Sequence, residues 1–535
     1  MKSLFFFAFR AQSLLPKGHR SMHRACLFAV LFLSATAHGA SVSFHQLVLG
    51  ADGQNGIFSV DLDGDGRRDL IGLSGGRISV YRADPKEATG YAPRPEELLT
   101  GPHAYYADAA DVLPAKGKEI LVLTPTGIFA YFQEGGRFAL IPQPLVRCST
   151  ILSMVGVRGG LAAAQTEMVA VLPWNFAFDA NGDGLDDLLV PHDGGVDVHL
   201  QTAPGQFAKP ITLSVFPFAY HMPPEGYGPG EFAGFTARGI RIQVIFRDIE
   251  RRDVNGDGKP DLVCGACWFA QKLDGSFDPR PAVVPGWAAP TNRDRGLRTL
   301  DLNGDGRQDS LHESLIPEDP LNLRTRVRIF LTGNDGQPPP TPSQVVVDQN
   351  ILIHTQLPVH DFNGDGALDF AMFKTDITPT MVAKWIRQCF GKIDGYLNFY
   401  LFNKAANCYG SRPDRPAAPA FSKRIRMNFK VDLMEAMMGL VWERYLATMM
   451  RFEGDYNADG RPDLLVRDET NHISIYLNTG DPVRLYPEEP DIALEGVPAF
   501  GGLALDDLNG DGATDLILYL GNYDHVIAAY VSRRR

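Results

Sequence analysis

Short apolar runs recur along the chain, and most of them begin at an aspartate that ends an acidic segment. Examples are DLIGL from Asp69, DFAMF from Asp369 and DLILYL from Asp515. Runs of this length, with branched residues and bounded by Gly or Asp, are typical of buried β-strands. Residues 69–83 continue with a tight turn and an alternating strand, and another apolar segment precedes each acidic one. With an outer strand added, the pattern predicts units of about four antiparallel strands.

The acidic segments are copies of one nonamer, Asp-x-Asp/Asn-Gly/Ala-Asp-Gly-x-x-Asp, so the chain is an internal repeat. Seven copies begin at Asp61, Asp179, Asp253, Asp301, Asp361, Asp455 and Asp507. If each fixed residue has a frequency of roughly one in twenty, a single copy arises by chance in well under one chain in a hundred. Position 6, where a sharp turn favours positive φ, is always glycine: Gly66, Gly184, Gly258, Gly306, Gly366, Gly460 and Gly512.

The spacing within the nonamer predicts a calcium site in each copy. Calcium takes six to eight oxygen ligands at about 2.3 to 2.6 Å, and alternate residues of a curled loop point several oxygens at one centre. We expect side-chain oxygens from positions 1, 3, 5 and 9 and a backbone carbonyl from position 7. The predicted ligands, in chain order, are Asp61, Asp63, Asp65, Arg67, Asp69, Asp179, Asn181, Asp183, Leu185, Asp187, Asp253, Asn255, Asp257, Lys259, Asp261, Asp301, Asn303, Asp305, Arg307, Asp309, Asp361, Asn363, Asp365, Ala367, Asp369, Asp455, Asn457, Asp459, Arg461, Asp463, Asp507, Asn509, Asp511, Ala513 and Asp515.

Other loops with a similar beginning fit less well. An EF-hand closes with a bidentate Glu at position 12 and lies between two helices, whereas no copy here has a carboxylate at position 12. Magnesium prefers a stricter octahedron and keeps its waters. Paired dockerin modules and tandem nonapeptide rolls do not match seven scattered copies. We therefore predict about seven structural Ca²⁺ ions, each in a turn between two strands.

The units predict an all-β protein, a β-propeller of about eight four-stranded blades. Residues 105–132 follow the same strand pattern without the ligands, and we interpret them as an eighth, metal-free blade. The last unit shows only three strands, so residues 42–49 are expected to pair with it and close the ring. The alternative is seven blades, with residues 105–132 absorbed as an insertion.

The loops resemble those of the FG-GAP and VCBS repeat family, the calcium-binding propellers of integrin α subunits and many exported bacterial proteins. The resemblance covers residues 41–535 discontinuously and rests on the aspartate nonamers. The Phe-Gly and Gly-Ala-Pro elements that name the family are mostly missing, with Phe500-Gly501 as one trace. This departure favours the bacterial exported type over a relative of the integrins.

Two insertions are candidates for specificity, because loops on a rigid scaffold usually carry binding. Residues 205–245 are rich in aromatic residues, Pro and Gly. Residues 375–450 contain two helix-like pieces, Thr380–Phe390 and Asp432–Leu446, with a basic strand, FSKRIRMNFK, between them. A packed loop or cap is the simpler interpretation of each insertion.

The first residues look like an export signal. Basic residues precede the apolar run from Ala25 to Ala37, which is too short to cross about 30 Å of hydrocarbon. We predict a signal peptide over residues 1–37 and a propeller over residues 38–535, with cleavage after Ala37 or, alternatively, after Ala40. The predicted location is secreted, periplasmic or on the cell surface, without a membrane span in the mature chain.

Composition and charge add two constraints. The chain is 44% hydrophobic, and its net charge of −12 argues against nucleic-acid binding, which normally needs a basic surface. Loss of the five basic residues of the leader changes the net charge to −17, and seven Ca²⁺ ions would bring it to −3. Calcium is therefore expected to neutralise most of the acidic charge.

The cysteines and histidines carry little information. Cys389 and Cys408 lie in one insertion and are candidates for a disulfide, while the Cys264–Cys267 pair follows a calcium loop and does not open a helix as a thioredoxin-like motif would. No Gly-x-Ser-x-Gly, His-Glu-x-x-His or phosphate-loop motif occurs. The candidates by residue type alone, interpreted as structural, are His103, His221, His312 and His360.

Two functions are compatible with these features. The first is an exported, non-catalytic binding or adhesion module for an extracellular glycan or protein of unknown identity, with no catalytic residues. The alternative is a polysaccharide lyase or other glycan-degrading enzyme, since some lyases use similar calcium-bearing propellers. The fold does not decide between them.

Overall fold

The computed structural model describes residues 42–534 apart from gaps. The gaps are 51–53, 75, 88–89, 101–105, 115, 125, 151–153, 157–164, 172–174, 193–194, 215–219, 222–238, 246–248, 265–266, 284–293, 317–323, 335–338, 351–356, 376–389, 431–449, 470, 498–501 and 520–525. Every regular element of the described part is a β-strand, so the all-β prediction is confirmed. No helix in that part is long and apolar enough to span a membrane.

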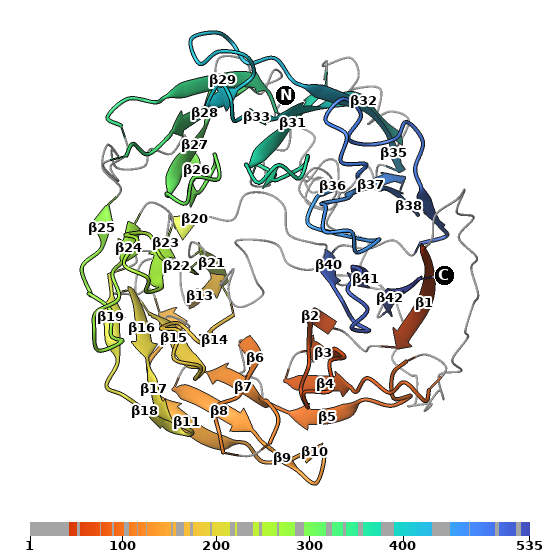
Figure 1. Ribbon diagram of the computed structural model, residues 1–535. Helices are drawn as coiled ribbons and strands as arrows, with labels where there is room; N and C mark the ends of the chain where they lie inside the picture. The colour runs from red at the N-terminus through yellow and green to blue at the C-terminus, as the bar shows by residue number, and fades with distance from the viewer. Residues whose placement is uncertain are drawn as a thin grey trace, which may run out of the picture.

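The strands form four-stranded antiparallel sheets arranged in a ring around a common centre (Figure 1). Six sheets have this form: β2(Gln54–Val60), β3(Asp69–Ser74), β4(Arg77–Tyr81) and β5(Glu96–Leu99); β6(Tyr106–Ala110), β7(Glu119–Thr124), β8(Gly127–Tyr131) and β11(Gln143–Arg147); β14(Ala177–Phe178), β15(Asp187–His192), β16(Gly195–His199) and β19(Ile211–Leu213); β22(Ile249–Arg252), β23(Asp261–Cys264), β24(Cys267–Phe269) and β25(Ala282–Val283); β26(Asp294–Leu300), β27(Asp309–Ile316), β28(Arg324–Phe330) and β29(Gln344–Gln349); β40(Gly502–Asp506), β41(Asp515–Tyr519), β42(Val526–Arg534) and β1(Val42–Gly50). This arrangement is a β-propeller.

The ring closes as the sequence predicts. Strand β1 pairs along its whole length with β42, from Val42 opposite Arg534 to Gly50 opposite Val526. A cluster of buried residues that includes Leu70, Tyr81 and Ile517 then packs the last sheet against the sheet of β2–β5. The first and last segments of the described chain are thus held together by hydrogen bonds and by an apolar core, which removes an open edge.

The prediction of eight blades is not confirmed by the sheets as they stand. Residues 359–495 form one eight-stranded sheet from β30(Val359–His360), β31(Asp369–Thr375), β32(Phe390–Tyr400), β35(Phe421–Lys430), β36(Met450–Arg451), β37(Leu464–Glu469), β38(His472–Tyr476) and β39(Ile492–Glu495). Two antiparallel halves merge because Asn428 of β35 pairs in parallel with Glu469 of β37. Strands β6, β7 and β8, which fall within the range 105–132, in contrast form with β11 a sheet of their own, as predicted for the metal-free unit.

The helical insertion is not supported either. Residues 380–389 and 432–446 lie outside the described residues, and Phe390, the end of the first expected helix, begins strand β32. Its alternation of exposed and buried side chains matches a two-residue strand period rather than a helical one. The basic segment FSKRIRMNFK is confirmed as strand β35.

One sheet was not anticipated. Strands β12(Met154–Gly156), β13(Gln165–Val171), β20(Tyr220–His221) and β21(Gly239–Ile245) form it, with β13 and β21 parallel. Figure 1 places β13, β20 and β21 on the inner side of the ring. Two-stranded hairpins complete the described elements: β9(Gln133–Glu134) with β10(Arg137–Phe138), β17(Gln201–Ala203) with β18(Gln206–Phe207), and β33(Phe402–Asn403) with β34(Cys408–Tyr409).

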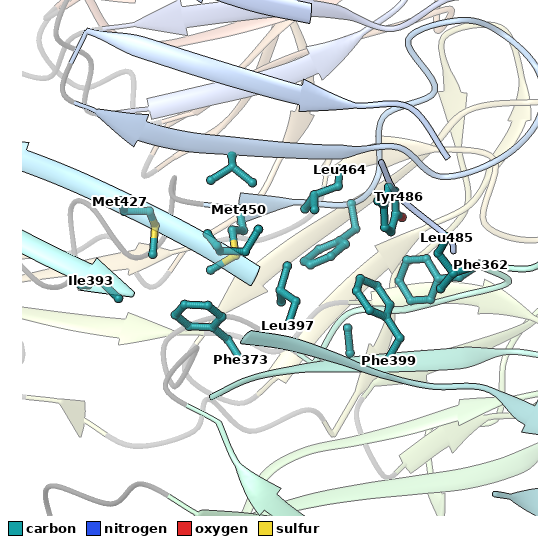
Figure 2. Packing of buried hydrophobic residues seen from close by; sticks show 14 residues of the cluster. Phe362, Phe373, Ile393, Leu397, Phe399, Met427, Met450, Leu464, Leu485 and Tyr486 are labelled. Carbon is teal, nitrogen blue, oxygen red and sulfur yellow. The ribbon is translucent and has the colours of Figure 1, made fainter. Parts of the chain in front are cut away.

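The core lies between neighbouring sheets. Alternate residues of each strand face the next sheet, so each interface is filled by two sets of apolar side chains. Figure 2 shows the corresponding cluster between the two halves of the eight-stranded sheet, in which Phe373, Leu397, Met427 and Tyr486 pack together from β31, β32, β35 and the segment after β38. The sheets are thereby stacked side by side around the ring, and their connecting loops lie at the rims.

Candidate metal-binding loops

Each of the seven nonamers connects the first strand of its unit to the second. The loop from Asp61 lies between β2 and β3, and the loop from Asp507 lies between β40 and β41. The other five occupy the corresponding connections after β14, β22, β26, β30 and β36. The predicted strand-loop-strand setting is therefore confirmed, and the loops do not lie between helices as in an EF-hand.

The aspartate at position 1 folds the loop around itself in every copy. Its Oδ2 accepts a hydrogen bond from the N–H of position 6 at 2.7 to 3.1 Å. In the first copy, Asp61 Oδ1 also accepts the N–H of Gly64 at 2.7 Å. Although desolvation acts in the opposite direction, the bonds from Gly66 and Gly64 hold the pKa of Asp61 below its ordinary value. The carboxylate is thus kept charged at the centre of the turn.

At positions 3 and 5, the side-chain oxygen accepts the backbone N–H of the residue two positions further along the chain. The side-chain oxygen of position 3 accepts the N–H of position 5 at 2.8 to 3.2 Å. Position 5 accepts the N–H of position 7 at 2.8 to 3.0 Å. These local bonds are typical of Asp and Asn in turns, and they direct successive side-chain oxygens toward one side of the loop.

Two positions of the loop, not one, require a left-handed backbone. Gly66 and its equivalents at position 6 have φ between 80° and 87°, as expected from the sequence. Position 4 is also left-handed, with Gly64 at 77° and, in the sixth copy, Ala458 at 53°. Ala458 is one of two non-glycine residues with positive φ among the described residues. The sequence carried this signal, since position 4 is glycine in the other six copies.

The aspartate at position 9 has a role that the sequence analysis missed. Its Oδ2 accepts the N–H of position 2 at 2.7 to 3.3 Å. Its Oδ1 accepts an N–H within two residues of the end of the third strand at 2.5 to 2.9 Å. All seven of these aspartates are at most 3% exposed. We call this arrangement the latch, because it fastens the loop to the third strand of its own sheet.

Burial has a uniform effect on the latch carboxyls. Desolvation raises the pKa of all seven, to about 6 for Asp69 and Asp309 and to about 7 for Asp187, Asp369, Asp463 and Asp515; it also raises that of Asp261. The backbone hydrogen bonds oppose this shift. Position 9 thus differs from the exposed positions 3 and 5 in both environment and partners.

The metal-free loop between Asp111 and Glu119 retains the half of the latch that holds position 2. Glu119 stands at position 9, and its Oε2 accepts the N–H of Val112 at 2.9 Å and that of Leu113 at 3.1 Å. Position 1 is still Asp, but ligand positions 3 and 5 are Leu113 and Ala115. The carboxylate that holds position 2 is thus kept where the oxygen ligands at positions 3 and 5 are lost.

Hydrogen bonds also join consecutive loops around the ring. Arg68 N–H donates to Leu508 O at 3.0 Å, which links the first nonamer to the last. Lys118 N–H donates to Leu62 O, and Leu368 N–H donates to Leu302 O, each at 2.8 Å. Amide side chains continue the pattern in other places, as Asn478 Nδ2 donates to Phe362 O at 2.8 Å. The loops therefore form a nearly continuous belt.

The first loop brings three predicted ligands together. Ligand oxygens of Asp61, Asp63 and Asp65 lie within 4.8 Å of one another, and Asp69 is not part of that group. It is the one such acidic cluster among the described residues. The donor set is all oxygen, which suits calcium. In the other six loops position 3 is Asn, whose Nδ2 donates to the carboxylate at position 5, so fewer carboxylates converge.

The remaining candidates are dispersed. His103, Cys389 and most of the 205–245 insertion lie outside the described residues. His312 is buried, and its Nδ1 lies 3.2 Å from Arg328 Nη1. His360 packs against the Phe362 ring, and burial lowers the pKa of the His360 imidazole. Cys408 is a free thiol, so the structure does not support the predicted Cys389–Cys408 disulfide.

Comparison with known proteins gives two results. A family model described as FG-GAP-like repeat matches residues 253–311 and 455–518. A search of curated protein sequences found no match.

Among solved structures, a chain from an Agrocybe aegerita lectin, described by specific recognition of non-reducing terminal N-acetylglucosamine, has 13% identity and a TM-score of 0.36. This match covers 75% of the present chain and 100% of that chain. A chain from BBS1N in complex with ARL6DN has 8% identity and a TM-score of 0.32, covering 91% and 95%. Together, the family match and the ring of sheets show that the chain carries FG-GAP-like repeats arranged as a β-propeller.

Proposed function

We propose that this protein is an exported, calcium-stabilised β-propeller that acts as a non-catalytic binding or adhesion module for a glycan or protein. The observation that carries the proposal is the identical construction of seven loops. Each exposes oxygen ligands at positions 1, 3 and 5 and is fastened to its sheet by the latch. A metal bound there would tie together the turn and the sheet, which is a structural task, and would leave the other rim and the insertions for partners.

The residues present fit calcium in the first loop. Asp61, Asp63 and Asp65 offer carboxylate oxygens within 4.8 Å of one another, and the carbonyl of Arg67 follows them in the chain. When bound, Ca²⁺ supplies positive charge that offsets the repulsion among these carboxylates. The chain's own hydrogen bonds shape the turn, since Asp61 accepts the N–H groups of Gly64 and Gly66. Loops with Asn at position 3 are proposed to bind more weakly.

We also propose that the propeller has eight blades. The eight-stranded sheet consists of two antiparallel halves that share one parallel residue pair, Asn428 with Glu469. Counting each half separately, with the six four-stranded sheets, gives one unit for every nonamer and one for the metal-free loop. The hydrogen bond from Leu368 N–H to Leu302 O and that from Thr514 N–H to Asp455 O connect loops of successive units, in support of this count.

Metal analysis of the purified exported protein tests the calcium part of the proposal. At equilibrium dialysis against buffer with millimolar Ca²⁺ as its only divalent cation, we expect the protein compartment to hold an excess of several calcium ions per chain, up to about seven. A preparation that is folded by circular dichroism but holds no calcium would overturn this part.

A glycan array probed in calcium tests the binding part. Selective binding without turnover supports a binding module. Release of unsaturated products from an acidic polysaccharide would instead establish a lyase.

A further inference from the structure

We infer that one face of the β31–β32–β35 sheet is a binding surface for an anionic polysaccharide, with Tyr396 as a platform between rows of cations. The inference rests on the proposed function and deepens it by naming the ligand class and the site. We call this surface the basic face. It consists of Lys374, Lys392, Asp394, Tyr396, Arg424 and Arg426.

The register of the strands places these side chains on one side of the sheet. Tyr396 of β32 lies opposite Lys374 of β31 on one flank and opposite Arg424 of β35 on the other. Two residues along, Asp394 lies opposite Arg426. Because side chains alternate between faces with a period of two, these residues all project in the same direction.

The opposite face of the β31–β32–β35 sheet is buried in the hydrophobic core. Ile393, Leu397 and Met427 are at most 1% exposed and pack in the cluster that Figure 2 shows. The basic face is correspondingly open: Lys374, Lys392, Asp394, Tyr396, Arg424 and Arg426 are all exposed. Tyr396 is 48% exposed, one of few large apolar rings left on the described surface. A sheet that buries one face and exposes another with this composition has a surface available for a ligand.

The charge of the basic face is opposite to that of the whole chain. It carries four cations and one carboxylate, whereas the chain has a net charge of −12. Asp394 pairs with Arg424, with Nε to Oδ1 at 2.9 Å. Asp394 also attracts Arg426 and Lys392, and its single negative charge offsets only one of the four positive charges of this face, so cationic donors remain for an anionic ligand.

The border of the basic face is built from polar groups that already have partners. Asn398, the next residue of β32 on this side, is 7% exposed and donates to Asp348 Oδ2 at 2.9 Å. Tyr400 Oη donates to the same oxygen at 2.6 Å. The carboxylate of Asp348 keeps its charge at this border, and the four cations of the basic face outnumber Asp348 and Asp394 by two.

The geometry favours a glycan over a peptide. Peptides commonly add a strand at a sheet edge or place an apolar helix face in a groove. Tyr396 lies on β32, which is paired with β31 on one side and with β35 on the other, and the apolar residues of the sheet lie on the opposite face, so the centre of the basic face presents neither an open strand edge nor an apolar groove. Neighbouring strands are about 4.8 Å apart, so the row Lys374–Tyr396–Arg424 spans roughly 10 Å. A sugar ring stacked on the Tyr396 ring would place its acidic substituents beside cations on both flanks, and guanidinium groups bind carboxylate or sulfate in a bidentate manner.

The test measures binding of the full mature chain, in millimolar Ca²⁺, to four immobilised probes: polygalacturonate, dextran sulfate, neutral dextran and poly-glutamate. We expect binding to one or both anionic glycans, weakened by added salt, and none to neutral dextran. Preference between polygalacturonate and dextran sulfate distinguishes a carboxylated from a sulfated ligand. Binding to poly-glutamate in place of the glycans, or equal binding to neutral dextran, would overturn the inference.

Variants locate the site. Arg424→Ala/Arg426→Ala should weaken glycan binding by about tenfold or more, whereas the matched control Arg412→Ala/Arg415→Ala, which removes the same charge from an exposed loop, should change it less than about threefold. Asp394→Asn should strengthen binding, which a merely destabilising substitution would not do. Equal losses in both double variants would refute the location.

Thermal unfolding with and without a chelator is recorded on the same samples. If the melting temperature depends on calcium but no anionic glycan binds, the basic face fails as a glycan site while the calcium-stabilised propeller stands. If the chelator leaves the melting temperature unchanged, yet substitution of Arg424 and Arg426 weakens glycan binding, the calcium proposal fails and the binding surface stands.

Discussion

The loop at residues 455–463 and the loop at residues 111–119 occupy equivalent connections, yet they share only part of their chemistry. Both fix position 2 through a carboxylate at position 9, Asp463 in one and Glu119 in the other. Only the first also has oxygen ligands at positions 3 and 5. The comparison separates two tasks within one motif: the buried position 9 holds the fold of the connection, and the half-buried position 1 with the more open positions 3 and 5 forms the candidate metal cage.

Calcium withdrawal is expected to have the largest effect. At millimolar calcium, a site with a Kd of about 10⁻⁴ to 10⁻³ M contributes roughly 0.4 to 1.4 kcal/mol, so seven sites contribute about 3 to 10 kcal/mol to the free energy of unfolding. Chelation should lower the melting temperature accordingly. Hydrogen exchange should accelerate in the seven nonamers and much less in residues 111–119. Uniform acceleration in all eight loops would contradict the division of tasks.

Removal of a latch carboxylate should come next. Asp463→Ala leaves the buried N–H groups of Tyr456 and Asn478 without an acceptor, at a cost of about 2 to 5 kcal/mol. Because this cost is independent of metal, denaturant unfolding should show it with and without chelator. Glu119→Ala in the metal-free loop should behave alike.

The exposed cage provides the contrasting variant. Asp459→Asn at position 5 should lower stability in calcium and have little effect in chelator, since it removes a candidate ligand and no latch. If Asp459→Asn and Asp463→Ala respond to chelator in the same way, positions 5 and 9 do not have separate roles.

The metal-free sheet contains a buried carboxyl outside the latch that should contribute to the pH dependence of stability. Asp108 of β6 is 5% exposed, and its Oδ2 accepts the N–H of Ala177 from the neighbouring sheet at 3.0 Å. Burial raises the pKa of Asp108 to about 7. Between the unfolded and folded pKa values, the folded state binds more protons, so stability falls as pH rises.

Asp108→Asn removes that titration. We expect the unfolding free energy of this variant, relative to the wild type, to increase by about 1 to 3 kcal/mol from pH 5 to pH 8 in calcium. The substitution can also change the unfolding free energy by an amount that does not depend on pH. That amount is the same at pH 5 and pH 8, so it cancels when the two pH values are compared. A difference that stays constant across the range would show that Asp108 titrates normally.

The smallest effect concerns the backbone of the sixth loop. Ala458 has φ at 53°, a conformation that glycine adopts without strain. Ala458→Gly should raise stability by about 0.5 to 1 kcal/mol. Gly64→Ala in the first loop is the mirror experiment and should lower stability by a similar amount, because its added Cβ meets no atom within 4 Å and only the φ strain remains. Opposite signs in calorimetry would refute the assignment of strain.

Much of the fold was accessible from the sequence because it depends on residues close together in the chain. The apolar run after Asp69 forms β3, and the missing outer strand of the last unit is β1, as predicted. The helix-like pattern of Thr380–Phe390 predicted a helix that ends at Phe390, whereas Phe390 begins strand β32. The pairing of β13 with β21 could not be foreseen, because two segments more than sixty residues apart meet through tertiary contacts.

In the candidate site, too, contacts within the nonamer could be predicted from the sequence, whereas contacts with distant strands could not. Asx-type bonds such as Gly66 N–H to Asp61 span five residues, so the nonamer itself specifies the curled loop. The latch partner of Asp369 is the N–H of Phe402, 33 residues further on, and that acceptor role appears only when the third strand is in place. The basic face likewise needs the register that sets Tyr396 beside Lys374 and Arg424.

Taken alone, the sequence determined seven acidic turns, the strands that flank them and the need to close the ring, because short-range hydrogen bonding and two-residue periodicity follow directly from the order of residues. Tertiary structure decided which carboxylates are buried as latches, which loops touch across the ring and which cations share a surface. These properties depend on strand register and on the packing of neighbouring sheets, and distant segments set both.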